Sequence, residues 1–159
     1  MCVCSCVCRV PIKVELRYSK AILTPTLDVI DTTTGAALVC GLLLPSLDSA
    51  HLDVTARMTE IIREQCGSDV GVCMDRLLVV HVSSPSVPSL DVIDLPGIVA
   101  ASSRAEVAAD VPAKTRQLVE RYIASHPDSL YLAVVEAGSR FSCAACLECI
   151  QAHNLQVSE

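Results

Sequence analysis

Residues 90–98 read LDVIDLPGI, and they carry the strongest fold signal in the chain. Four mostly apolar residues, typical of a short strand, are followed at once by Asp94, Leu95, Pro96 and Gly97. Proline lacks a backbone donor and has a fixed φ angle, and with the glycine it ends a strand sharply. The stretch therefore predicts a buried strand that ends on a carboxylate at the edge of a sheet.

Asp94 and Gly97 have the spacing D-x-x-G, which suits a phosphate with its metal ion. A carboxylate at a strand tip can hold Mg²⁺ through a water, because hard cations prefer oxygen ligands. The glycine lets its main-chain N–H come close to a γ-phosphate. Two fixed positions in four residues also occur by chance, so the motif alone favours a plain strand-ending turn.

Strand and helix patterns alternate before this stretch. Residues 10–18 and 75–82 alternate apolar and polar side chains, which is typical of half-buried strands. Residues 51–66 have a helical period, with Gly67 as the predicted C-cap. Residues 19–50 contain several turn signals and predict one or two strands with loops.

After this stretch the pattern continues with helices at 113–124 and 142–153. Residues 129–137 are a near-continuous apolar run, which predicts a strand covered on both faces. A helix between two strands favours an α/β fold with a parallel sheet. We expect Asp94 to end a central strand, with 129–137 parallel on one side of it and 75–82 antiparallel on the other.

Composition excludes several classes of protein. The chain has 159 residues, 52% of them hydrophobic, which excludes intrinsic disorder. A net charge of −6 and only 3% aromatic residues argue against nucleic-acid binding. The longest apolar run, residues 36–44, is far shorter than the ~20 residues of a membrane helix. The N-terminus has no signal-peptide pattern, so we expect a cytoplasmic protein.

Cysteines form two patterned groups among the ten in the chain, Cys2-Cys4-Cys6-Cys8 and Cys143-Cys146-Cys149. The second group, C-x-x-C-x-x-C, superficially resembles an iron–sulfur ligand run but lacks the fourth cysteine and the proline. Its surroundings predict a helix, on which the three thiols form a stripe. We expect the three to bind no metal and at least one to pack into the core. The four histidines form no zinc-binding pair of the H-x-x-x-H kind.

Residues 90–98 resemble the switch II segment of the dynamin family of large GTPases, an apolar strand that ends in Asp-Leu-Pro-Gly-Ile. Residues 8–16, CRVPIKVEL, look like the segment and strand that carry switch I in that family. Residues 83–90, SSPSVPSL, are similar to the entry to the switch II strand. The similarity covers most of the chain, with about 19–50 as the poorly matching part. The resemblance implies a P-loop GTPase fragment with a mixed, mainly parallel sheet flanked by helices.

The resemblance implies a partial G domain over residues 9–159, after a divergent cysteine-rich segment at 1–8. It implies GTP and Mg²⁺ as cofactors, with Asp94 holding the metal through a water and the Gly97 amide contacting the γ-phosphate. Residues 95–96 and Arg9 would adjoin the nucleotide. Cys8 stands where the family has the switch I threonine.

The departures from the family are equally specific. No G-x-x-x-x-G-K-[ST] phosphate loop occurs in the chain, and none of Lys13, Lys20 and Lys114 follows a glycine. The guanine-reading motif would lie beyond Glu159. We therefore expect a truncated domain of a dynamin-like, membrane-remodelling GTPase, inactive by itself. Self-assembly with other G domains, microtubule association and a peripheral membrane location are implied by the family only.

Two other functions remain open at this stage. The chain can be a non-catalytic pseudo-GTPase module whose sheet binds a partner. It can also be a cysteine-rich redox or metal-binding protein, based on the two cysteine groups.

Overall fold

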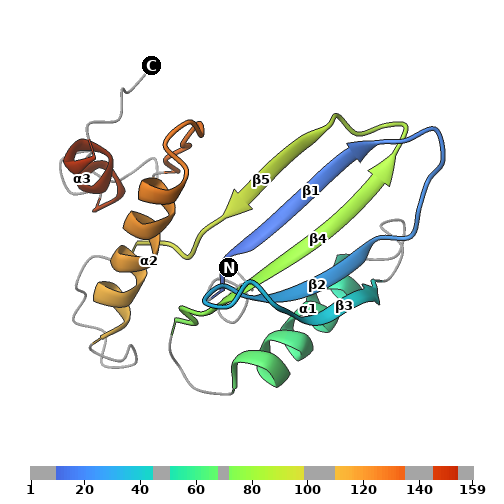
Figure 1. Cartoon of the computed structure of the whole chain (residues 1–159), viewed down its shortest axis with the longest axis horizontal. Coiled ribbons are helices and arrows are strands. Elements are labelled where there is room, and N and C mark those ends of the chain that lie inside the picture. The colour runs from blue at the N-terminus through green and yellow to red at the C-terminus, as the bar shows by residue number, and fades with distance from the viewer. Residues whose placement is uncertain (1–9, 45–50, 68–71, 99–109, 135–144, 154–159) are drawn as a thin grey trace. The chain divides into compact units, whose positions relative to one another are not determined.

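The computed structural model describes residues 10–44, 51–67, 72–98, 110–134 and 145–153 (Figure 1). The chain divides into two compact units, Met1–Pro96 and Gly97–Glu159. Among the described residues, the first unit contains the sheet and one helix, and the second contains two helices. Within these described residues no helix has the length and apolar character needed to cross a membrane.

The first unit is built on a five-stranded mixed sheet with the order β3-β2-β4-β1-β5. Only β1 and β4 are parallel neighbours, and the other three pairs are antiparallel. The strands are β1 (Ile12–Tyr18), β2 (Thr26–Asp31), β3 (Ala37–Leu43), β4 (Arg76–Ser84) and β5 (Leu90–Asp94).

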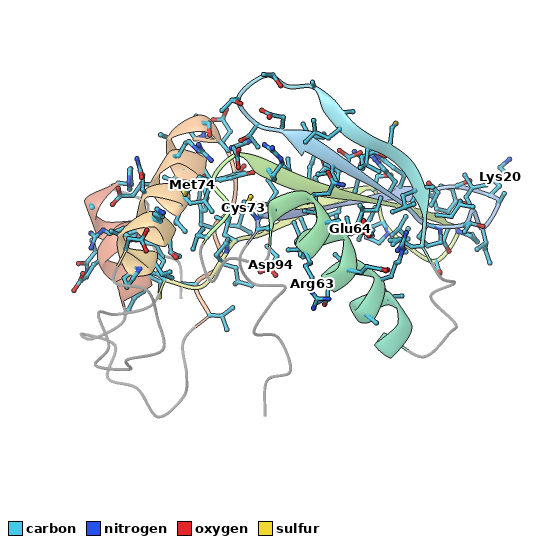
Figure 2. The ribbon with its side chains drawn as sticks, turned by 90° about the horizontal axis from the view of Figure 1, so that it is seen from below. Lys20, Arg63, Glu64, Cys73, Met74 and Asp94 are labelled. Atoms are coloured by element: carbon cyan, nitrogen blue, oxygen red, sulfur yellow. The ribbon has the colours of Figure 1, made fainter. Side chains whose placement is uncertain are left out.

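Helix α1 (His51–Cys66) packs along one face of this sheet, as Figures 1 and 2 show. Strand alternation sends Ile12 to the α1 face and Lys13 to the opposite face. Ile61 of α1 and Leu78 of β4 are among the fully buried side chains of the resulting core. Burying a side chain of this size contributes about 1.5–3 kcal/mol, so the α1 face holds the unit together.

Glycine ends α1 as the sequence predicts. Gly67 has a φ of 79°, in the left-handed region where a side chain is strained and glycine is not. The helical period of 51–66 and this C-cap are both confirmed.

The second unit contains α2 (Val111–Ser125) and α3 (Ala145–Ala152). Pro112 lies in the first turn of α2, where its missing N–H costs no helical bond. At the other end, the backbone N–H of His126 donates to the carbonyls of Tyr122 and Ile123. The rings of Tyr122 and His126 are stacked, with 5.6 Å between their centres. Leu118 and Cys149 are buried, so the predicted burial of at least one cysteine of the C-x-x-C-x-x-C group is confirmed.

Three predictions about the strands are wrong. Strand β5 is an edge strand and not a central one, because β1 takes the place between β4 and β5. Residues 76–84 do form a strand, but it neighbours β1 and not β5. The sheet is mixed as predicted, yet it is mainly antiparallel and not mainly parallel.

Residues 129–134 form no strand, also against prediction, and Leu130 and Leu132 are 94% and 88% exposed. A strand needs a neighbour for its N–H and C=O groups, and no strand lies among the described residues of this second unit. Residues 135–137 of the same prediction lie outside the described part of the chain.

Candidate functional site

The predicted switch segments meet at one edge of the sheet, the edge that is formed by the ends of the strands and not by an outermost strand. Strands β1 and β5 pair antiparallel, with Ile12 opposite Asp94. The chain therefore enters β1 at the same edge where it leaves β5. Figure 2 labels Asp94 at this edge. Cys8 and Arg9, the predicted switch I residues, lie outside the described residues.

The entry to β1 is firmly held. Val10 and Pro11 are buried, and the Pro11 carbonyl accepts a hydrogen bond of 3.1 Å from the Leu78 N–H of β4. The start of β1 is therefore fixed on β4 on one side and on β5 on the other.

Asp94 presents an exposed carboxylate. Within the described part of the chain, no hydrogen bond or ion pair engages it. Pro96 is buried, whereas Gly97 is exposed. A Cβ built on Gly97 would meet nothing within 4 Å, so there is open space beside its Cα. This carboxylate can bind a hydrated cation, and the glycine leaves its own backbone accessible.

A second acidic group lies at the same edge, but it is already occupied. Asp31 pairs with Arg76 across β2 and β4, with 3.0 Å between Oδ2 and Nη1. Its other oxygen accepts from the Thr33 hydroxyl and from the N–H of Thr34 at 3.0 Å. The Thr33 hydroxyl, followed by the Thr34 N–H, lowers the pKa of Asp31 to about 2. Asp31 therefore stabilises the turn after β2 and is a poor choice for a ligand-binding group.

Two free thiols, one at the end of α1 and one just before β4, lie close together, and no pattern in the sequence indicates this pairing. Cys66 and Cys73 lie close enough to shift each other's pKa, and Cys73 Sγ lies 3.4 Å from Asp75 Oδ1. The hydrogen bond from Cys73 lowers the pKa of Cys66, whereas that of Cys73 is raised. Their spacing of seven residues matches no motif, so only the folded chain reveals the pair.

Charged side chains form a row on the sheet face opposite α1, in the order Asp91, Arg17, Lys13, Glu15, His81 and Asp28. Asp91 of β5 pairs with Arg17 and, at 3.1 Å, with Lys13 of β1. His81 lies between Glu15 at 3.3 Å and Asp28 at 3.1 Å. Asp91 and Glu15 each pair with both Lys13 and Arg17, which favours a structural role that fixes β5 on β1.

No protein-family model matches this chain, and no curated protein matches it either.

Proposed function

We propose that this chain is part of a GTP-binding domain of the dynamin type, in which Asp94 holds Mg²⁺ through a water and Gly97 contacts the γ-phosphate. The observation that supports the proposal most is the pairing of Ile12 with Asp94. Switch I and switch II must both reach one γ-phosphate, so the segments that carry them must share an edge of the sheet.

The exposed Asp94 and the open space at Gly97 also agree with this role. The charged row on the face opposite α1 holds β5 in its register with β1, and this register sets the position of Asp94 at the strand ends. The two contacts of Asp94 and Gly97, of about 0.5–3 kcal/mol each, total about 1–6 kcal/mol, which is compatible with millimolar binding (about 4 kcal/mol) and falls short of the ~8 kcal/mol of micromolar binding. Without a phosphate loop, the half-site binds triphosphate weakly and does not position it for hydrolysis.

Nuclear magnetic resonance titration of the ¹⁵N-labelled chain with millimolar Mg²⁺ and GTP tests this proposal. Amide shifts should be confined to residues 8–12 and 94–98, and Asp94→Asn should abolish them. Asp128→Asn, which removes another exposed carboxylate, should leave them unchanged. ATP should act like GTP, because no guanine-reading motif occurs in the sequence. Shifts that survive Asp94→Asn, or that lie elsewhere, would contradict the proposal.

A non-catalytic interaction module is the second candidate, and the free edge of β5 favours it. In the described sheet β5 has a neighbour on one side only, and its Leu90 and Val92 are 50% and 45% exposed. An unpaired edge of this kind can add a strand from another chain. Val92→Lys should then weaken self-association in sedimentation velocity experiments. Leu38→Lys, on the opposite edge strand β3, is the matched control.

A further inference from the structure

Three metal-binding side chains converge in the second unit. Glu120 of α2 and Cys149 and His153, the latter just after α3, place one donor atom each within 4.8 Å of one another. Cys149 and His153 are four residues apart, so they lie on one face of the helical segment, about one turn apart. The His153 N–H donates to the Cys149 carbonyl at 3.3 Å, which continues the helical geometry to the histidine.

We propose that Glu120, Cys149 and His153 bind one zinc ion, with the fourth position open to water. Zinc is bound in proteins by thiolate, imidazole and carboxylate donors, and sites with three protein ligands keep one position for a water. Mg²⁺ and Ca²⁺ prefer oxygen donors throughout, so a set with a thiolate and an imidazole selects against them. This site is independent of the proposed nucleotide site.

The distances allow such a site after a small adjustment. Tetrahedral zinc, with bonds of about 2.0–2.3 Å, separates its donors by roughly 3.4–3.6 Å. The donors here lie within 4.8 Å, so side-chain rotations that close the gap by about 1 Å suffice. A pair of ligands at i and i+4 on one helix is the arrangement that zinc fingers also use.

The surroundings suit a metal ligand set. Cys149 is 1% exposed, which shields the sulfur, whereas His153 is half-buried and gives a route from solvent. Arg116 donates through Nε to Glu120 Oε1 at 3.0 Å, and its Nη1 lies 3.6 Å from Glu148 of α3. It therefore orients the Glu120 carboxylate, as outer-shell partners of metal ligands do. Binding displaces the thiol proton of Cys149 to solvent, and the thiolate and carboxylate together balance the charge of Zn²⁺.

This proposal replaces one expectation from the sequence. The C-x-x-C-x-x-C spacing predicted no metal at Cys143, Cys146 or Cys149, because thiols spaced along a helix do not form a cage. Cys149 binds instead with partners outside that motif. The relevant spacing is C-x-x-x-H, completed by a glutamate from another helix, and a search for histidine pairs does not detect it.

The number of zinc ions bound per full chain tests the site. The protein is equilibrated with zinc at a free concentration set by a chelator, and its bound metal is measured by mass spectrometry. The other cysteines can also bind zinc, so the difference between variants is the readout. The free zinc concentration is set so that it just saturates the wild type. At that concentration the His153→Gln and Glu120→Gln variants should each bind one zinc ion per chain fewer than the wild type. Their affinity at this site should fall at least 100-fold, since even outer-shell partners contribute about 10–100-fold.

Cys146→Ser and His126→Gln are the matched controls and should keep the wild-type stoichiometry, because neither residue belongs to the set. Circular dichroism checks that each variant is folded; Cys149→Ser is avoided because that side chain is in the core. Cobalt substitution gives a second readout, a thiolate charge-transfer band that His153→Gln should weaken. Equal zinc content in the wild type, His153→Gln and Glu120→Gln would overturn the proposal.

Discussion

Ile12 lies directly opposite Asp94 in the antiparallel register of β1 and β5. One residue begins its strand and the other ends its strand, so the segments on either side of them share one edge of the sheet. This pairing connects parts of the chain that are far apart in sequence. The proposed nucleotide half-site is therefore supported by the register of two strands as well as by the sequence motif.

We predict that the chain alone hydrolyses GTP at no rate above the buffer background. Phosphoryl transfer depends on positioning and charge stabilisation, and the phosphate loop that provides most of both does not occur in the sequence. Phosphate release in millimolar Mg²⁺ is the measurement, with Asp94→Ala alongside. Release that Asp94→Ala abolishes would reveal a phosphate-binding segment of a different kind.

The second prediction concerns acid stability at Asp31. Its pKa of about 2 lies below the ordinary 3.8, so its stabilising effect is complete above about pH 4 and is lost as the pH falls through 2. Asp31→Asn should lower the urea midpoint at pH 7, and the difference from the wild type should shrink towards pH 2. Asp128→Asn is the control and should show no such convergence. A difference that is constant with pH would contradict the assignment.

Core packing gives the third prediction. Leu78 is fully buried and lies opposite both Ile12 of β1 and Val29 of β2. Leu78→Ala should lower the free energy of unfolding by about 2–5 kcal/mol, because the lost contacts leave a cavity. Leu130→Ala, at a position 94% exposed, should change it by no more than about 0.5 kcal/mol. Urea denaturation of both variants makes the comparison.

The fourth prediction concerns the reactivity of Cys66. The hydrogen bond from Cys73 lowers its pKa, so removing the donor should raise the pKa and reduce the thiolate fraction. Cys73→Ala should slow alkylation of Cys66 several-fold near neutral pH. Cys73→Ser keeps a hydrogen-bond donor and should preserve most of the rate. Peptide mass spectrometry follows each site, and equal rates in both variants would show that the hydrogen bond has no such effect.

Local patterns predicted local structure well. The helical period at 51–66 and the stop at Gly67 give α1 its exact bounds, because both signals depend on neighbouring residues. Alternation at 10–18 likewise predicted β1, where odd and even positions face the charged row and the core.

Strand order was not predictable in the same way, because it depends on partners distant in the chain. Nothing in residues 90–94 indicates that β1 would pair with them ahead of β4. The apolar run at 129–134 carries strand propensity without a neighbouring strand. The Cys66–Cys73 pair and the cluster of Glu120, Cys149 and His153 were missed for the same reason, since their members come from different elements.

Placing β1 between β4 and β5 has a consequence for how the first unit assembles. Strands β4 and β5 follow each other in the chain, yet neither can complete the sheet by forming a hairpin with the other. Strand β5 pairs only with β1 in the described sheet, and this pair joins residues farther apart in sequence than any other strand pair, so its contacts form late. Like β3 at the opposite edge, this strand has one neighbour only, so it opens more readily than the central strand β4 in the native state. Hydrogen exchange should therefore be faster at residues 90–94 than in β4, and Asp94 would sit on a weakly protected strand of its sheet.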